Sequence, residues 1–198
     1  ARVTVVEGDA LELTWPPADL LAGNLPFSIA TAVITRALEL RIPRWVVMVQ
    51  REVGNRICSG PGSRHYGRLS VLAALYGKAE LFLPVTSEAF YPTPKVDGVV
   101  IRFDARADPM PVSSVPELEA IVRGLFHQRR KQLGNILPRL FRSKAAGLAE
   151  AALWPHDWQQ LRPEQLSPDA FFRLAQAART AGAVPTLSSP SKAANPLE

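Results

Sequence analysis

The pattern of hydrophobic and polar positions changes near residue 105 and divides the chain into two parts. Before that point, short apolar or β-branched runs bounded by glycine, proline or aspartate predict strands, which we place at residues 2–6, 19–22, 44–50, 79–85 and 96–103. From residue 116 to about residue 179, apolar residues recur at helical spacing instead. The pattern predicts an α/β domain followed by a small helical domain.

Helical patterns separate several of these strands. One runs to Leu40, with Ser28 or Thr31 as its N-cap. Two more are expected at residues 52–58 and 68–76. The run at 44–50 is too apolar to alternate, which is typical of a strand covered on both faces. Strands separated by helices favour a mainly parallel sheet, whose ligands bind at the carboxyl ends of the strands.

Proline-bearing and small polar stretches mark the domain boundaries. We expect an α/β domain at residues 1–104, a linker at 105–115, a helical domain at 116–180 and a disordered tail at 181–198. In the helical part, Ser167 followed by Pro168 predicts an N-cap and the first residue of the last helix.

Amino-acid composition and charge indicate the class of protein, its partner and its compartment. The 198 residues are 47% hydrophobic and 21% charged, as in soluble globular proteins. A net charge of +5 and a pI near 9.8 favour a polyanionic partner. Cys58 is the only cysteine, which fits a reducing, cytoplasmic setting. The histidines lack ligand-like spacing, so we expect no metal site, and no apolar run reaches the ~18 residues of a membrane span.

The stretch "NLPF", from Asn24 to Phe27, follows a predicted strand and opens a predicted helix. It can form an ordinary proline turn. It also suits a nucleobase amine, because the Asn24 side chain and a main-chain carbonyl in the turn would accept the two N–H bonds of that amine. Pro26 would hold the turn rigid while Phe27 stacks on an unpaired base. An amide does not titrate usefully, so Asn24 would orient the amine rather than deprotonate it.

Four motifs in this order resemble those of the KsgA-type rRNA adenine N6,N6-dimethyltransferases. They are "GNLPFSIAT", "QREVGNRICSGPGSRHYGRLSV", "EAFYPTPKVDGVVIRF" and "FHQRRKQLGNIL", and the resemblance extends over roughly residues 1 to 142. It implies a Rossmann-like class I methyltransferase domain with a small helical domain. It further implies transfer of methyl groups from S-adenosylmethionine to two adjacent adenines near the 3′ end of small-subunit rRNA. We expect a cytoplasmic monomer that acts on the immature small ribosomal subunit.

The resemblance also assigns the residues around the target base. Asn24 and the Leu25 carbonyl would accept hydrogen bonds from the target amine. Phe27, where the family often has tyrosine, would stack on the adenine, and Phe90 would form the second aromatic wall of the pocket. Lys95 would lie near the RNA backbone.

On the cofactor side, Asp9 matches the acid that binds the adenine amino group, with Ala10 beside it and Asn24 nearby. From the residues alone, the favoured interpretation of Asp9 is an acid that merely ends a strand. The family's glycine-rich loop and ribose-binding acid have no counterpart in the sequence. We therefore expect an N-terminally truncated product with an incomplete sheet, which keeps the adenine-binding edge without the methionine and ribose contacts. Methyl transfer is accordingly expected of the full-length parent.

Basic residues further along the chain are candidates for RNA binding. Residues 115–150 contain seven Lys/Arg and three Asp/Glu, a net charge of +4, which is commonly a solvated helix face. The resemblance favours binding of rRNA phosphates by Arg129, Arg130 and Lys131. Arg64 and Arg68, in and after a Gly/Pro loop, are either RNA contacts or loop-packing residues.

Other functions stay open. The "NLPF" turn is shared with the macrolide-resistance methyltransferases, which modify a single adenine of large-subunit rRNA, although "GPGSRHYGRLSV" with "QRRK" favours the small-subunit type. A non-catalytic assembly or transcription factor of the same fold would bind RNA without transferring methyl groups. A nucleotide-binding enzyme unrelated to RNA would have no affinity for ribosomal particles.

Overall fold

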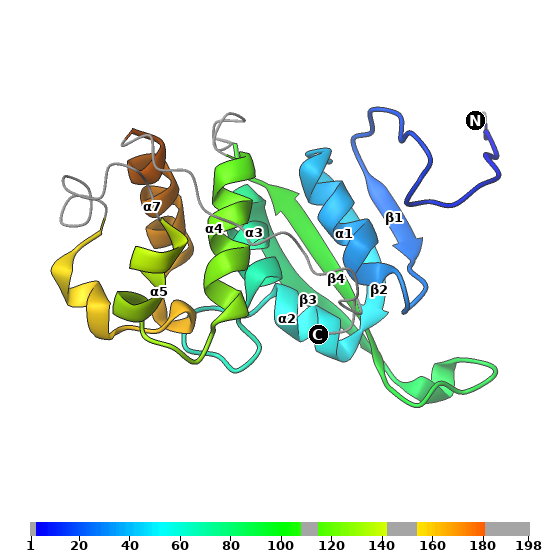
Figure 1. Ribbon diagram of the computed structural model, residues 1–198. Helices are drawn as coiled ribbons and strands as arrows, with labels where there is room; N and C mark the ends of the chain where they lie inside the picture. Colours follow the sequence, from blue (N-terminus) through cyan, green and yellow to red (C-terminus); the bar gives the residue numbers. More distant parts are fainter. Residues whose placement is uncertain (1–2, 108–114, 142–153, 181–198) are drawn as a thin grey trace. The chain divides into compact units, whose positions relative to one another are not determined.

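The computed structural model describes residues 3–107, 115–141 and 154–180, which belong to two compact units. The first unit comprises residues 1–58 and 76–109, and the second comprises 59–75 and 110–198. The chain therefore enters the second unit, leaves it to complete the first, and then returns. The sheet lies wholly in the first unit, and the second is helical in its described part (Figure 1).

The first unit is built on a four-stranded sheet with the order β1-β2-β4-β3. The strands are β1 (Leu21–Asn24), β2 (Arg44–Gln50), β3 (Gly77–Val85) and β4 (Gly98–Ala105). Strands β1 and β2 pair in parallel, but β4 is antiparallel to both β2 and β3. The prediction of a mainly parallel sheet is wrong for these strands, because β3 and β4 form a hairpin and the loop between them reverses the chain.

One face of this sheet forms the core of the first unit. In β2 the buried residues alternate: Trp45, Val47 and Val49 are fully buried, and they pair with Phe103, Ile101 and Val99 of β4. The Trp45 and Phe103 rings stack with their centroids 4.2 Å apart. Val46, on the opposite face, is 38% exposed, so the prediction that this strand is covered on both faces is wrong.

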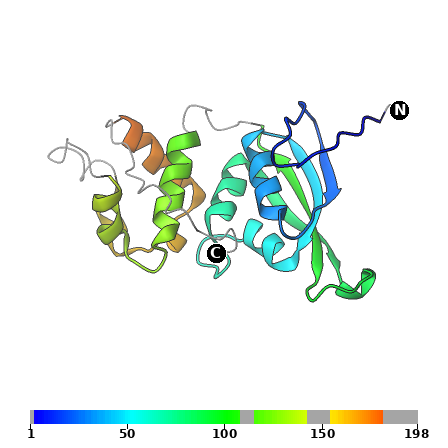
Figure 2. The ribbon, with the colours of Figure 1, turned by 45° about the vertical axis from the view of Figure 1, so that its right-hand side comes forward.

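Helices α1 (Ala30–Glu39) and α2 (Arg51–Ile57) lie on the same face of the sheet, as both views show (Figures 1 and 2). Helix α2 contacts β2, β3 and β4. Its approach is close at Gly54, where an added Cβ would lie 2.4 Å from Cγ1 of Val99. A glycine is therefore needed at that position for the helix to pack at this depth.

The start of the chain differs from the prediction. Residues 3–7 form no strand, and Val3, Val5 and Val6 are exposed. Strand formation needs a hydrogen-bonded neighbour, and among the described strands none pairs with these residues. The strand expected at 19–22 begins two residues later as β1, and it is largely exposed because it is an edge strand of the sheet.

Other predicted elements form where local pattern placed them, with shifts of one or two residues at several ends. The strand at 44–50 and the helix α3 (Arg68–Tyr76) are confirmed at their predicted bounds. The N-cap of α1 is Ile29, which makes no side-chain capping bond, so the prediction of Ser28 or Thr31 is wrong. Backbone bonds from the preceding turn hold this helix start instead.

The second unit contains, besides most of α3, the helices α4 (Val115–His127), α5 (Leu133–Leu140) and α7 (Pro168–Thr180) and the 3₁₀ turns η3 (His156–Gln160) and η4 (Pro163–Gln165). Helix α4 contacts both α5 and α7. Phe126 packs against the rings of Tyr66 and Phe171. Helix α7 begins at Pro168, and the Ser167 hydroxyl accepts the Ala170 N–H at 3.2 Å, which confirms the predicted start. Most of the expected linker (108–114) and all of the expected tail (181–198) lie outside the described residues.

Candidate target-base and cofactor site

The register of the sheet brings two predicted site segments to one end of it. Asn24 pairs with Met48 near the carboxyl end of β2, and Gln50, the last residue of β2, pairs with Gly98. Gly98 in turn pairs with Val85, the last residue of β3. The turn that follows β1 and the loop between β3 and β4 therefore lie at the same end of the sheet, as ligand sites in α/β sheets do.

The turn after β1 is held by its backbone. The Leu25 N–H donates to the Met48 carbonyl at 3.1 Å, and the Ile29 N–H donates to the Pro26 carbonyl at 3.1 Å. Leu25 is buried, Phe27 is half-buried, and Asn24 and Pro26 are exposed. The turn thus joins β1 to α1 with Asn24 and Pro26 at the surface and Leu25 buried.

Two polar groups of this turn take no part in the bonds that hold it. Within the described part of the chain, neither the Asn24 carboxamide nor the Leu25 carbonyl has a hydrogen-bond partner. An asparagine that shapes a turn bonds to the backbone two residues on. Asn24 does not, so its side chain stays available to a ligand.

The loop after β3 carries Phe90, which is half-buried, and Lys95, which is exposed. Asp97 anchors this loop at its return into the sheet. One oxygen of its carboxylate accepts the Ser87 N–H at 3.0 Å, and the other forms an ion pair with Arg51 at 3.3 Å. The Arg51 N–H also donates to the Asp97 carbonyl at 2.9 Å. Sequence analysis missed Asp97, although an acid immediately before a strand at this sheet end was a visible clue.

Asp9 lies in a turn and does not end a strand. Its carbonyl accepts the N–H groups of Glu12 and Leu13 at 3.0 and 2.9 Å, and Oδ1 of its carboxylate accepts the Leu11 N–H at 2.8 Å. In the described part of the chain, Oδ2 and the Ala10 N–H have no partner. An acceptor and a donor on consecutive residues match the amine and the adjacent ring nitrogen at the edge of an adenine, so these residues fit the cofactor base.

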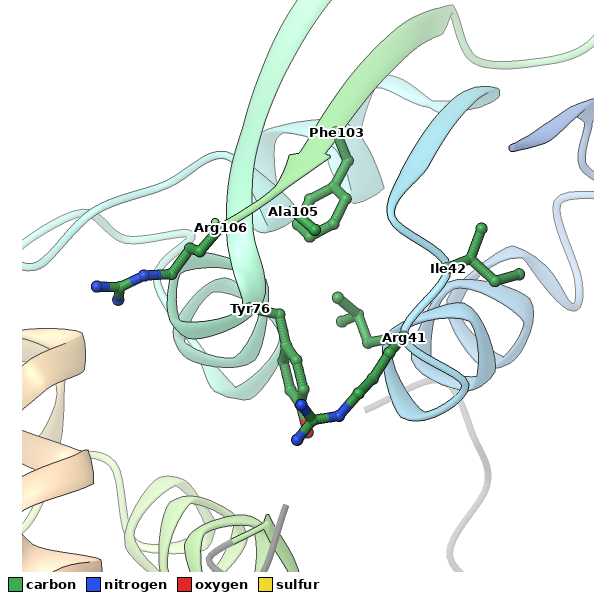
Figure 3. Close-up of a pocket in the computed structure, with 7 residues that line it drawn as sticks. Arg41, Ile42, Tyr76, Phe103, Ala105 and Arg106 are labelled. Atoms are coloured by element: carbon green, nitrogen blue, oxygen red, sulfur yellow. The ribbon is translucent and has the colours of Figure 1, made fainter. Parts of the chain in front are cut away.

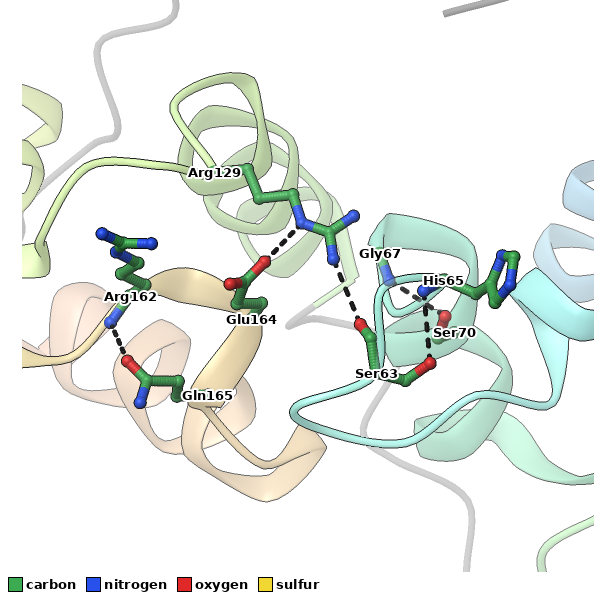
Figure 4. Close-up of polar contacts among 8 residues, drawn as sticks. All are labelled: Ser63, His65, Gly67, Ser70, Arg129, Arg162, Glu164 and Gln165. Carbon is green, nitrogen blue, oxygen red and sulfur yellow. Dashed lines mark hydrogen bonds and ion pairs between the residues drawn. The ribbon is translucent and has the colours of Figure 1, made fainter.

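Apart from Lys95, the predicted RNA-binding residues belong to the second unit, and their surroundings differ; Figure 4 shows those of Arg129. Arg129 donates from Nε to Glu164 at 2.6 Å and from its terminal nitrogen to the Ser63 carbonyl at 3.1 Å. Its guanidinium therefore ties the loop at 59–67 to η4. Arg130 and Lys131 are exposed.

The two arginines near the Gly/Pro loop also differ from each other. Arg64 is exposed and donates to His65 Nε2 at 3.0 Å. Arg68 is half-buried, and its Nε has no hydrogen-bond partner among the described residues. The structure therefore leaves Arg64 as the more accessible of this pair.

A separate pocket of about 180 Å³ lies at the other end of the sheet (Figure 3). It is lined by Leu38, Arg41, Ile42, Tyr76, Phe103, Ala105 and Arg106. Arg41, the residue after the C-cap of α1, has φ 55°, and its guanidinium carbon lies 5.7 Å from the centre of the Tyr76 ring. No predicted site residue lines this pocket, so it is distinct from the candidate site.

Metal ligands and membrane-spanning helices can be assessed for residues 3–107, 115–141 and 154–180. Within those ranges no group of three or more His, Cys, Asp or Glu side chains is placed to hold a metal ion. None of the helices seen there is long and apolar enough to cross a membrane.

The family profile "Ribosomal RNA adenine dimethylase" matches residues 1–155. The chain belongs to this family. The resemblance stated from the four motifs is thereby confirmed.

Two relatives of this dimethylase-family chain are each named ribosomal RNA small subunit methyltransferase A. The one from Acidothermus cellulolyticus is 38% identical over 191 residues, which is 90% of this chain and 63% of the relative. The one from Syntrophotalea carbinolica is 39% identical over 187 residues, 88% of this chain and 69% of the relative. The chain thus spans about two thirds of the length of these curated relatives.

Solved structures show the fold of this family member. A dimethyladenosine transferase from Plasmodium falciparum superposes with a TM-score of 0.74 at 22% identity, covering 91% of this chain and 74% of that one. The 23S rRNA methyltransferase ErmE superposes with a TM-score of 0.61 at 23% identity, covering 85% and 69%. The predicted α/β class, with the Rossmann-like fold of class I methyltransferases, is confirmed.

Proposed function

We propose that this adenine dimethylase family member is a small-subunit rRNA adenine dimethyltransferase. It methylates the N6 amines of two adjacent adenines near the 3′ end of the rRNA, with S-adenosylmethionine as donor, as a cytoplasmic monomer in ribosome biogenesis. The observation that carries the proposal is the pair of unpartnered acceptors, the Asn24 carboxamide oxygen and the Leu25 carbonyl, on a turn whose backbone is fixed. The names of the relatives support the choice of subunit.

The turn acts by positioning. An adenine amine is a weak nucleophile because its lone pair is delocalised into the ring, and two acceptors on its N–H bonds direct that lone pair at the methyl carbon. S-adenosylmethionine would supply the methyl carbon and keep the electron pair of its S–CH₃ bond as it leaves as a thioether. The methylated amine would then release a proton to solvent. Phe27 and Phe90 stack on the flipped base and hold it in line.

S-adenosylmethionine supplies an already activated methyl group, so the protein needs no metal and no strong base for this transfer. Asp9 Oδ2 and the Ala10 N–H hold the adenine edge of this cofactor, and Asn24 lies at the meeting point of cofactor and target base. The donor and acceptor left free on the turn at Asp9 support this assignment.

Basic side chains hold the rRNA backbone. Arg130 and Lys131, which are exposed, neutralise phosphates together with Lys95, Arg64 and Arg68. Arg129 contributes indirectly: its bonds to Glu164 and to the Ser63 carbonyl hold the loop at 59–67 against η4, beside the exposed cations.

The test is methyl transfer from labelled S-adenosylmethionine to immature small subunits and, in parallel, to protein-free large-subunit rRNA. It uses a protein with the full length of the curated relatives, of which this chain spans about two thirds. We expect dimethyladenosine in the small-subunit rRNA. Asn24→Ala should lower kcat by about 10²–10³-fold, as removal of one preorganised polar contact does at other enzymes. Asn135→Ala, at an exposed asparagine of α5, is the matched control and should keep full activity.

Each other outcome contradicts a stated part of the proposal. Transfer confined to large-subunit rRNA would identify the macrolide-resistance type. Binding to subunits without any transfer would identify a non-catalytic assembly factor. Full activity of Asn24→Ala would remove the target-base site from the "NLPF" turn.

A further inference from the structure

Arg36, in the last turn of α1, contacts a loop more than twenty residues earlier in the chain. Its guanidinium donates to the main-chain carbonyls of Leu11 and Leu13, and to that of Ala10 at 3.3 Å. The segment at residues 10–13, whose carbonyls Arg36 binds, forms no strand or α-helix. One side chain of α1 therefore binds three main-chain carbonyls of this loop.

Trp15 contacts both the Arg36 guanidinium and the Ala10 carbonyl. The Arg36 guanidinium carbon lies 5.3 Å from the centre of the Trp15 ring, within the range of a cation–π interaction. The indole Nε1–H donates to the Ala10 carbonyl at 2.7 Å. The Ala10 carbonyl thus accepts from both Arg36 and Trp15.

These contacts set the orientation of two successive peptide planes. The Asp9 carbonyl points into its own turn, where it accepts the Glu12 and Leu13 N–H groups. In a trans peptide the N–H points opposite to the carbonyl, so the Ala10 N–H is directed out of the turn. The next carbonyl, that of Ala10, is held by Arg36 and Trp15. The free N–H of Ala10 and the free oxygen of Asp9 are therefore presented together.

The guanidinium has no competing acidic partner. Among the ion pairs of the described residues, none involves Arg36, and its donors go to carbonyl oxygens. A half-buried guanidinium that donates to several carbonyls forms charge-assisted bonds, which are stronger than neutral ones. The same helix begins directly after the "NLPF" turn, so α1 connects the target-base turn to the loop at residues 9–15.

We infer that Arg36, together with Trp15, is a positioning residue for the adenine edge of the cofactor: it orients Asp9 and Ala10. This inference rests on the proposed function for the identity of the ligand. The contact itself is independent of that function.

The experiment compares the whole chain with its variants Arg36→Ala, Trp15→Phe and the control Arg44→Ala, an exposed arginine of β2. Amide hydrogen exchange at Leu11, Glu12 and Leu13 reports the loop, and calorimetric titration with S-adenosylhomocysteine reports the adenine edge. For Arg36→Ala we expect exchange to quicken and affinity to fall, each at least about tenfold, the effect of losing one charge-assisted bond. Trp15→Phe keeps a ring and loses the N–H donor, so its effect should be smaller, and Arg44→Ala should change neither quantity.

Steady-state kinetics separate positioning from general loss of structure. Arg36→Ala should raise KM for S-adenosylmethionine with kcat nearly unchanged, because the "NLPF" turn is intact. Unchanged exchange in Arg36→Ala would overturn the contact, and unchanged affinity would overturn its role in binding. Absence of S-adenosylhomocysteine binding by the unsubstituted chain would instead contradict the proposed function, with the exchange data still deciding the contact.

Discussion

Arg129 and Arg130 are neighbours in one basic run, yet they have different surroundings. Arg129 is bound to Glu164 and to the Ser63 carbonyl, whereas Arg130 is exposed. A guanidinium that is already bound to a carboxylate and a carbonyl of the fold contributes little to binding a phosphate. At the scale of single residues, the basic run therefore divides into one structural arginine and its exposed neighbours.

Arg129→Ala should lower the free energy of unfolding of the second unit by about 1–3 kcal/mol, because Glu164 and the Ser63 carbonyl lose their donor. Arg130→Ala should change it by less than about 0.5 kcal/mol, as surface substitutions usually do. Urea unfolding followed by circular dichroism measures both. Equal stability of the two variants would contradict the structural role of Arg129.

Tyr66 is a second residue whose role is structural. It is fully buried, its hydroxyl donates to the Leu166 carbonyl at 2.9 Å, and burial raises its pKa well above the usual value for tyrosine. A raised pKa in the folded state means that the neutral form stabilises the fold below the unfolded pKa near 10. That stability is lost as the pH rises above this value.

Tyr66→Phe should therefore cost about 1 kcal/mol at pH 7, the worth of one hydrogen bond, and should flatten the loss of stability above about pH 10. Melting temperatures of both proteins between pH 7 and 11 test this. Cys58, whose pKa burial and Glu80 raise to about 11, titrates in both proteins and cancels in the comparison. A Tyr66→Phe curve parallel to that of the unsubstituted protein would contradict the assignment.

At the scale of elements, Gly54 determines how closely α2 packs on the sheet. The helix packs on β4 so closely that a Cβ at Gly54 would meet Val99 at 2.4 Å and Leu81 at 3.2 Å. Both neighbours belong to the sheet, so the helix itself must move to accept a larger residue. Asp97 anchors the loop that joins β3 to β4, and α2 packs against both of these strands.

Gly54→Ala should destabilise the first unit. Alanine is favoured over glycine in a helix by about 1 kcal/mol, but overpacking of a core costs about 1–3 kcal/mol, so the steric effect prevails. Gly60→Ala, where nothing lies within 4 Å of an added Cβ, is the control and should be nearly neutral. Thermal unfolding of the two variants measures the difference, and an unchanged or raised melting temperature of Gly54→Ala would show that the helix shifts freely.

At the scale of the whole molecule, the net charge of +5 matters more than any single cation. Binding to a polyanion releases counterions, so affinity falls with salt in proportion to the number of phosphates neutralised. Exposed cations contribute to this dependence, and buried or paired ones contribute little.

Arg130→Ala should weaken binding to immature small subunits and lower the slope of log K against log salt by about one. Filter binding at several salt concentrations measures the slope. Arg173→Ala, at an exposed arginine of α7 outside the basic run, is the matched control. An unchanged slope for Arg130→Ala would exclude this residue from the RNA-binding surface.

Local pattern was sufficient for much of this protein. The strand at 44–50, the helix at 68–76 and the start of α7 at Pro168 follow from periodicity and capping residues that lie within a few positions of one another. The place of Asn24 at the carboxyl end of a strand and the family motifs depend equally on neighbouring residues. These features needed no knowledge of distant contacts.

Long-range contacts decided the rest. The antiparallel position of β4 between β2 and β3, the one-sided burial of β2 and the inclusion of residues 59–75 in the second unit all depend on segments far apart in the chain. The hydrogen bonds of Arg36 to the carbonyls of Ala10 and Leu11, and the ion pair of Arg129 with Glu164, also join segments far apart in the chain. Hydrophobic period reports which face of an element is apolar and carries no information on which distant residue meets it, so only the folded chain could assign these partners.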